Sequence, residues 1–301
     1  MRVAAVDCGT NSIRLLITDA GRSLHRELRI VRLGQDVDRT GRLAPEAIER
    51  TRLALADYAE LIAAHDVSRV RMVATSATRD ATNRDEFVAM VRETLGVDPE
   101  VITGADEAEL SFSGAVETIS GVSGKVLLVD LGGGSTELVL GSADSGHARN
   151  AYSMDVGSVR MTERHLHEDP PTSEQVAAVV AEVRSALDEA TGDVPVQDAD
   201  ALVGVAGTIT TIAAMVLGLD EYDSAAVHGT HLAAEQIADV ARRLAHMTHG
   251  ERAAVRVIHP GRVDVITAGA IILRTVVERA GVSEVVVSEH DILDGIAASI
   301  S

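Results

Sequence analysis

The sequence predicts an α/β protein built from two similar halves. Short apolar segments alternate with segments of helical periodicity along the 301 residues, which is typical of this class. Apolar residues make up 46% of the chain, enough to bury a sizeable core, and the length suits one large or two medium domains. A motif of one aspartate and several glycines occurs once in each half, so we expect a duplicated architecture.

The first half of the chain begins with two predicted strands, residues 3–6 and 13–18, on either side of the first motif. A helix is expected from Pro45, because proline is favoured in a first helical turn and apolar residues then recur at helical spacing. Residues 70–74 form the next predicted strand, and a further helix ends near Gly96.

The second half repeats the start of the first. Residues 126–131 and 137–140 are predicted strands around the second motif. Thr172 and Gln175 fit a capping box at the start of a helix that reaches about residue 190. The remaining predicted elements are a strand over 202–205, a helix after 208, helices around 237–244 and 264–279, and a strand over 285–287.

The repeated motif places the same residue types at the same offsets. Asp7 matches Asp130, Gly9 matches Gly132, and Ser12 matches Ser135, each within apolar flanks. Glycines let a backbone turn tightly and approach a ligand closely, while successive N–H groups and hydroxyls form an anion-binding concavity. Two such loops facing across a cleft would grip a phosphate chain, with the two aspartates holding Mg²⁺. Two ordinary hairpins with turn glycines are the alternative interpretation.

Composition limits the classes of partner. The chain holds 27 Lys and Arg against 46 Asp and Glu, a net charge of −19, so we expect no nucleic-acid partner. No apolar run is long enough to span a bilayer, and Cys8, the single cysteine, has no internal disulfide partner. These features predict a cytoplasmic protein without a membrane partner. Neither a P-loop nor a dinucleotide-binding glycine motif is present in the sequence.

Eight stretches resemble the actin-like ATPase superfamily and, more narrowly, the exopolyphosphatase and guanosine pentaphosphate phosphohydrolase (Ppx/GppA) family. They include both motifs, an Arg-bearing loop around Arg79, and a segment that matches the family's catalytic Glu at Glu107. The stretches are residues 7–15, 33–43, 74–83, 102–110, 130–137, 154–160, 204–208 and 287–289. Cys8 departs from the family, which usually has an aliphatic residue there, and we interpret it as a small buried side chain.

The resemblance implies duplicated actin-like ATPase (ribonuclease H-like) domains, each a mixed sheet flanked by helices, with an interdomain cleft. We expect the first domain over residues 1–118, joined by a C-terminal helix over 288–301, and the second over 119–287, with a crossover near 117–124. Long family members carry an additional C-terminal helical region, and this chain resembles the short forms, which suggests short polyphosphate chains as substrate. We expect a homodimer from the resemblance to the family alone.

The resemblance also implies roles for individual residues. Glu107 matches the general base, although a solvated carboxylate at a helix start is the alternative, and Arg79 is expected to bind phosphate. Gly207 and Thr208 correspond to the loop that contacts nucleoside in superfamily relatives. The expected phosphate donors are Thr10, Asn11, Ser12, Gly132, Gly133, Gly134 and Ser135, and the expected ligands of Mg²⁺, or of Mn²⁺ in its place, are Asp7, Asp130 and Glu137.

The predicted function is therefore exopolyphosphatase activity, the metal-dependent hydrolytic release of terminal phosphate from inorganic polyphosphate. Guanosine pentaphosphate 5′-phosphohydrolase activity is an alternative that uses the same loops. An ATP-dependent kinase or actin-like ATPase would need an adenosine pocket, and a non-catalytic phosphate sensor would not need Glu107.

Overall fold

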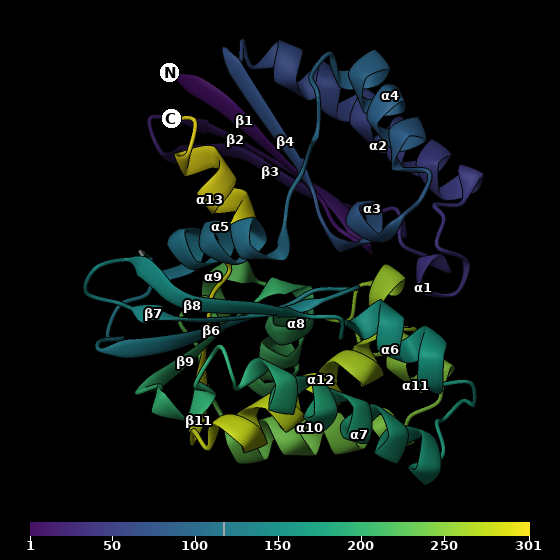
Figure 1. The fold of residues 1–301 in the computed structure, drawn as a ribbon, viewed down its shortest axis with the longest axis vertical. Helices are drawn as coiled ribbons and strands as arrows, with labels where there is room; N and C mark the ends of the chain where they lie inside the picture. Colours follow the sequence, from purple (N-terminus) through teal and green to yellow (C-terminus); the bar gives the residue numbers. More distant parts are fainter. Residues whose placement is uncertain (117) are drawn as a thin grey trace. The chain divides into compact units, whose positions relative to one another are not determined.

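The computed structural model describes residues 1–116 and 118–301, which form two compact units (Figure 1). Unit 1 comprises Met1–Gly114 and Ile292–Ser301, and unit 2 comprises Ala115–Asp291. Residue 117, the first of the predicted crossover over 117–124, lies outside the described residues.

Unit 1 is built on a five-stranded mixed sheet with the order β3-β2-β1-β4-β5. The first three strands are antiparallel, and β4 and β5 continue the sheet in parallel with β1. This arrangement brings the carboxyl ends of β1 and β4 to the same edge of the sheet. The strands are β1 (Arg2–Cys8), β2 (Ser12–Asp19), β3 (Arg22–Ile30), β4 (Arg69–Ala74) and β5 (Glu100–Val101).

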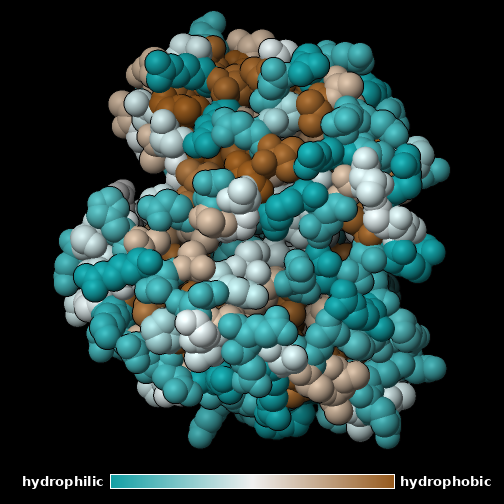
Figure 2. Space-filling model, viewed as in Figure 1, coloured by the Kyte–Doolittle hydropathy of each residue, from teal (hydrophilic) through white to brown (hydrophobic). Residues whose placement is uncertain are grey.

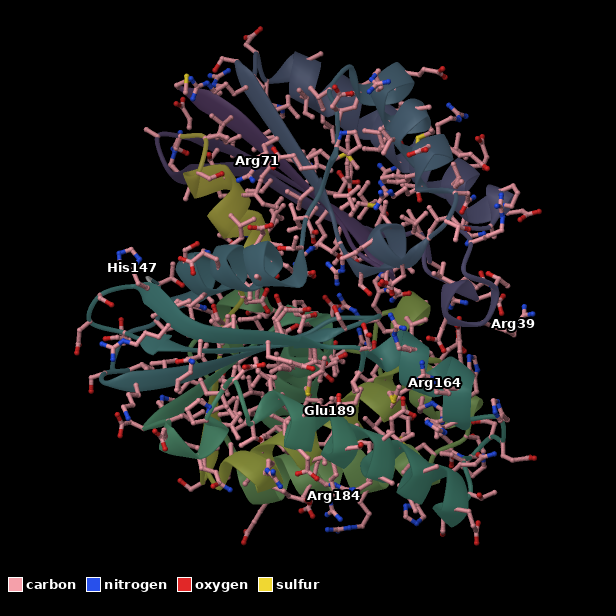
Figure 3. The ribbon with its side chains drawn as sticks, in the orientation of Figure 1. Arg39, Arg71, His147, Arg164, Arg184 and Glu189 are labelled. Atoms are coloured by element: carbon pink, nitrogen blue, oxygen red, sulfur yellow. The ribbon has the colours of Figure 1, made fainter. Side chains whose placement is uncertain are left out.

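Helices cover the sheet of unit 1. One core cluster includes Tyr58 and Phe87, from the two long helices α2 and α4, while Ile292 and Ile296 of the C-terminal helix belong to a second cluster. Chain ends that are far apart in sequence therefore share one fold, and Arg71 of β4 reaches Ser299 at 2.7 Å from Nη1 to Oγ (Figure 3). The helices are α1 (Val37–Thr40), α2 (Pro45–Ala64), α3 (Ser76–Asp80), α4 (Arg84–Leu95), α5 (Gly104–Val116) and α13 (Ile292–Ala298).

Unit 2 contains a six-stranded mixed sheet with the order β10-β11-β9-β6-β7-β8. Its first three strands in the chain are again antiparallel, and β9 and β11 again extend the sheet in parallel with β6. The strands are β6 (Lys125–Leu131), β7 (Thr136–Ser142), β8 (His147–Met154), β9 (Ala201–Val205), β10 (His231–Ala233) and β11 (Glu284–Val287).

The helices of unit 2 pack around a core of aliphatic side chains centred on α12, which is buried along nearly its whole length. The predicted capping box at Thr172 and Gln175 is confirmed at the start of α7. The helices are α6 (Ser158–His165), α7 (Ser173–Ala190), α8 (Ala206–Leu217), α9 (Ser224–Val227), α10 (Ala234–His246), α11 (His249–Ala253) and α12 (Ile266–Ala280), with short 3₁₀ turns at Val196–Asp198 and Pro260–Arg262.

The two sheets share one plan, which confirms the predicted α/β class with two mixed sheets flanked by helices. Sequence patterns missed the third strand of each half, β3 and β8. Both are edge strands, with β3 paired to β2 and β8 paired to β7, and both carry polar, partly exposed residues. Neither contains the apolar run that identifies a buried strand, so only pairing with the preceding strand reveals them.

The charged residues lie mainly outside the cores. The face shown in Figure 2 is largely hydrophilic. Several surface arginines are matched by carboxylates: Arg39 pairs with Asp36, and Arg164 pairs with Glu182 (Figure 3). Among the described residues, no helix combines the length and the apolar composition that crossing a membrane requires.

Candidate functional site

The first Asp–Gly loop connects β1 to β2 in unit 1. Gly9 closes the turn by donating its N–H to the carbonyl of Ser12 at 3.0 Å. The other loop carbonyls are bound by the segment that follows β3. Gly34 N–H reaches Thr10 O at 2.8 Å, and the N–H groups of Val31 and Arg32 reach Asn11 O at 3.0 and 2.9 Å.

The second Asp–Gly loop connects β6 to β7 in unit 2 and has the same bonding plan. Gly132 N–H donates to Ser135 O at 3.0 Å, as Gly9 does to Ser12. The segment after β8 again binds the loop carbonyls: Ser158 N–H reaches Gly132 O at 3.0 Å, and Val159 N–H reaches Gly133 O at 2.8 Å. Arg160 completes the set, because its Nε donates to Gly134 O at 2.7 Å.

This carbonyl bonding sets the direction of the loop amides. In a planar trans peptide, the C=O of one residue and the N–H of the next point to opposite sides. Since the carbonyls of Gly132, Gly133 and Gly134 point at α6, the N–H groups of Gly133, Gly134 and Ser135 point away from it. The same reasoning turns the N–H groups of Asn11 and Ser12 away from the segment after β3. Each loop thus presents successive amides, which is the arrangement of an anion-binding nest.

One glycine outside each motif makes room for the loop. A Cβ on Gly157 would lie 2.3 Å from the carbonyl oxygen of Gly133, and a Cβ on Gly34 would lie 2.3 Å from Cγ2 of Thr10. Any side chain at these positions would push the loops out of place. Sequence reasoning did not single out either glycine, since only their spatial neighbours show the need for them.

The two hairpins differ in the residue that faces the aspartate. Asp7 and Arg14 are directly paired in the register of β1 and β2, and Arg14 Nη2 lies 2.6 Å from Asp7 Oδ2. At the matching position of β6 and β7, Asp130 faces Glu137. Both carboxylates are buried, with exposures of 7% and 1%, and Glu137 Oε1 accepts a hydrogen bond from Ser153 Oγ at 2.7 Å.

The donor set in unit 2 suits a divalent metal. Two buried carboxylates directly opposite each other on neighbouring strands repel, and a cation between them would offset that repulsion. Within each unit, the described residues contain no group of three or more His, Cys, Asp or Glu side chains placed to hold a metal. Mg²⁺ does not need such a cage, because it commonly binds one or two carboxylates, several waters and substrate phosphates.

Glu107 is buried, with 8% exposure, and lies beside Arg79 in unit 1. Arg79 Nη1 is 3.0 Å from Glu107 Oε2 and 3.1 Å from the carbonyl oxygen of Ile102. The neighbouring Asp106 is exposed and bonds Thr103 at the start of α5, with 2.7 Å between Oδ2 and Oγ1. The first turn therefore directs Asp106 outward and Glu107 inward, so Glu107 is not the solvated carboxylate of the alternative interpretation.

Gly207 and Thr208 begin α8 at the carboxyl end of β9 in unit 2. The preceding Ala206 has φ of 74°, an uncommon value for a residue with a side chain. A Cβ on Gly207 would lie 2.2 Å from Nη2 of Arg262, so this glycine allows the guanidinium to rest on the backbone of the loop. The structure thus places a cation at this loop.

Two other arginines of unit 2, Arg252 and Arg256, bind protein groups. Arg252 is buried and bonds the carbonyls of Met247 and Val263 and the carboxylate of Asp169. Arg256 pairs with Glu221 at 3.0 Å on the surface. Cys8 is buried as expected, and burial together with the nearby charge of Asp7 raises the pKa of its thiol, which disfavours a nucleophilic thiolate.

Comparison with known proteins places this architecture among phosphatases. The model of the Ppx/GppA phosphatase family matches residues 17–300. Exopolyphosphatase 2 of Mycobacterium tuberculosis is 52% identical over 317 aligned residues, which cover 100% of this chain and 98% of the relative. A crystal structure of an exopolyphosphatase-like protein, 45% identical, superposes with a TM-score of 0.96 and covers 99% of this chain and 98% of its own. The Ppx/GppA family member of Aquifex aeolicus is 34% identical, with a TM-score of 0.81 and coverage of 99% and 97%.

Proposed function

Because this chain belongs to the Ppx/GppA phosphatase family, we propose that it is an exopolyphosphatase that releases terminal phosphate from inorganic polyphosphate by hydrolysis of a phosphoanhydride bond. The observation that carries this proposal is the pair of loops whose carbonyls are bound internally and whose amides are turned outward. Backbone amides recognise phosphate oxygens without regard to a base or sugar, which suits a substrate made only of phosphate.

We propose that the two units are the two domains expected from the sequence and that the Asp–Gly loop of each unit binds phosphate. The loop of unit 1 contributes Thr10, Asn11 and Ser12. The loop of unit 2 contributes its three glycines and the hydroxyl of Ser135. Losing one such donor would cost roughly 2.7–4 kcal/mol of transition-state stabilisation, by analogy with oxyanion holes. Gly207, Thr208 and the neighbouring Arg262 would contact phosphates further along the polyphosphate.

Asp130 and Glu137 are the residues that would hold Mg²⁺, or Mn²⁺ in its place. The bound ion would supply positive charge to the phosphate oxygens on which negative charge develops during hydrolysis. Asp7, the third expected ligand, stays a prediction. Its charge is already matched by Arg14, so the first hairpin has less need of a cation than the second.

Glu107 would act as the general base by accepting a proton from the attacking water. In the structure, one of its oxygens accepts from Arg79. A terminal phosphate would compete for that guanidinium, because charged phosphate oxygens bind arginine strongly. Arg79 would then neutralise phosphate, and the carboxylate oxygen would be released to bind and orient water. Substrate binding and base activation would thus be coupled through one side chain.

The proposal is tested by substituting Glu107→Gln, which keeps the shape of the side chain and removes its basicity. Turnover of polyphosphate should fall by about 10²–10⁴-fold with little change in substrate affinity. Glu109→Gln is the matched control, since Glu109 lies on the same helix but is exposed. Near-normal turnover of the Glu107 variant would remove this residue from the mechanism.

A substrate panel tests the reaction itself. Phosphate release should be measured with polyphosphates of several lengths, guanosine pentaphosphate and ATP, each with Mg²⁺ and with a chelator. We expect chelator-sensitive release that is fastest from polyphosphate. Faster release from guanosine pentaphosphate would favour the other activity of the family, and faster turnover of ATP would favour an actin-like ATPase. A cytoplasmic location and a homodimer remain family-level proposals.

A further inference from the structure

Unit 2 contains a concave site that involves none of the residues proposed for phosphate hydrolysis. It is a cavity of about 390 Å³ between the amino end of α7, the carboxyl half of α10 and the middle of α12. A volume of this size accommodates a small organic molecule. Its lining combines apolar side chains with three basic ones, and the residues that matter here are Val176, Ala241, Ile271, Arg242, His246 and Arg274.

The charge of this lining is opposite to the charge of the chain. Asp and Glu outnumber Lys and Arg by 46 to 27, yet none of the described residues that line the cavity is acidic. Arg242 and Arg274 bind carboxylates outside the lining: Asp239 at 3.0 Å and Glu278 at 3.4 Å. Surface ion pairs of this kind are weak, so an anion in the cavity could compete for both guanidinium groups.

His246 shares the lining with the two arginines. Its Nδ1 lies 2.7 Å from the carbonyl oxygen of Arg242. A carbonyl only accepts, so Nδ1 carries the hydrogen, and Nε2 of the neutral ring is then an acceptor. The donors that the lining offers to an anion are therefore the two guanidinium groups.

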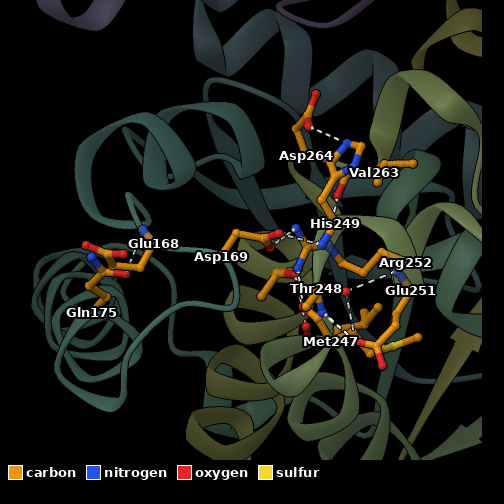
Figure 4. A network of polar contacts seen from close by, with 12 residues as sticks. Glu168, Asp169, Gln175, Met247, Thr248, His249, Glu251, Arg252, Val263 and Asp264 are labelled. Atoms are coloured by element: carbon orange, nitrogen blue, oxygen red, sulfur yellow. Dashed lines mark hydrogen bonds and ion pairs between the residues drawn. The ribbon is translucent and has the colours of Figure 1, made fainter.

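The wall of the cavity is held in place by a buried arginine (Figure 4). Pro170 and Pro171 form part of that wall, and the preceding Asp169 anchors them. Asp169 accepts from His249 N–H at 2.7 Å and from Arg252 Nη2 at 2.9 Å, and these donors hold the pKa of Asp169 below its usual value. Arg252 is 6% exposed and also bonds two backbone carbonyls, so the segment is fixed from behind.

The positive character of the cavity comes from side chains and not from the end of α7. Thr172 and Gln175 close that helix end in a capping box, with the N–H of each bound by the side chain of the other. Two of the N–H groups at this helix end are therefore already bound by residues of the helix start itself. What remains is a lining of apolar side chains and cationic groups, which matches a ligand with an apolar body and an anionic group.

We propose that this cavity binds a small organic anion with an aromatic or aliphatic body, whose acidic group contacts Arg242 and Arg274. Calorimetric titration with benzoate, phenylphosphonate and the neutral benzyl alcohol tests the proposal. One or both anions should bind at least about tenfold more tightly than the alcohol, the difference expected for one charge-assisted hydrogen bond. Equal binding of the alcohol would overturn the proposal.

Variants locate the binding. The double variant Arg242→Gln, Arg274→Gln should weaken anion binding at least about tenfold, the cost of losing charge-assisted contacts. Arg243→Gln is the matched control, because Arg243 is exposed on the same helix but does not line the cavity. Ala245→Leu narrows the cavity without changing its charge and should also weaken binding, so a poorly folded double variant does not prevent the test. Binding that both cavity variants leave unchanged, or that Arg243→Gln weakens equally, would refute the assignment.

Discussion

The β1–β2 and β6–β7 hairpins share the same pattern of backbone hydrogen bonds but differ in the charge of the residue that faces the aspartate. Both close with the same Gly-to-Ser hydrogen bond at 3.0 Å, and both have their carbonyls bound by the segment after the third strand. The difference lies at one register position, where Arg14 faces Asp7 and Glu137 faces Asp130. The first hairpin neutralises its aspartate with its own side chain, whereas the second concentrates negative charge in a buried position.

This comparison shows how a duplicated element can divide a task. The shared backbone presents successive amides in both units. The facing residue is an arginine in the first hairpin and a glutamate in the second, so under the proposed function only the second hairpin would hold the metal ion.

Glu137→Gln should have the largest effect on metal binding. The variant keeps an oxygen for the Ser153 hydrogen bond and removes the negative charge. The Mg²⁺ concentration for half-maximal activity should rise by at least the roughly 10–100-fold typical of losing an outer-shell partner of a metal site. Arg14→Gln should leave this concentration unchanged. Tighter Mg²⁺ binding in Arg14→Gln would show that Asp7 shares the ion, and the division between hairpins would be wrong.

Arg14→Gln should instead have the larger effect on stability. It leaves Asp7 as a buried charge without its ion-pair partner, which costs about 3–5 kcal/mol for a fully buried pair, and the 17% exposure of the Arg14 side chain suggests the lower end. Thermal unfolding in chelator should show a larger loss of Tm for Arg14→Gln than for Glu137→Gln, which keeps an oxygen for the Ser153 hydrogen bond and removes a like charge that faces Asp130. A larger loss of Tm for Glu137→Gln than for Arg14→Gln would contradict this comparison of the two hairpins.

The smallest expected contrast concerns the two supporting glycines. Gly157→Ala should disturb its loop more than Gly34→Ala, because the new Cβ meets backbone of Gly133 in one case and the Thr10 side chain in the other. Each unrelieved clash should cost about 1–3 kcal/mol, as overpacking commonly does. Thermal unfolding and the KM for polyphosphate measure the effect. Equal Tm and KM values for the two variants would show that the two loops tolerate the added Cβ equally well.

Much of the candidate site could be predicted from the sequence because its parts are local. The residues from Asp7 to Ser12, and those from Asp130 to Ser135, each lie within a single hairpin. The alternation of side chains along a strand therefore indicates which residues the turn exposes. The buried strands and long helices were readable for the same reason. The edge strands β3 and β8 were not, since polar edge residues follow no apolar pattern.

Other features depended on residues far apart in the chain. Arg79 meets Glu107 only because α3 and the start of α5 lie together in unit 1. Arg160 reaches Gly134, and Arg262 rests on Gly207, only when separate elements pack against one sheet. No spacing rule connects such pairs.

The sequence by itself determined that two Asp–Gly hairpins exist, that each follows a buried strand, and that the fold is α/β, because these properties follow from short-range periodicity and backbone preference. Tertiary structure alone decided that α6 binds the carbonyls of the second loop, that Glu107 is buried beside Arg79, and that basic residues of α10 and α12 share a cavity. Contacts of this second kind depend on packing between distant segments, which local sequence does not encode in a readable form.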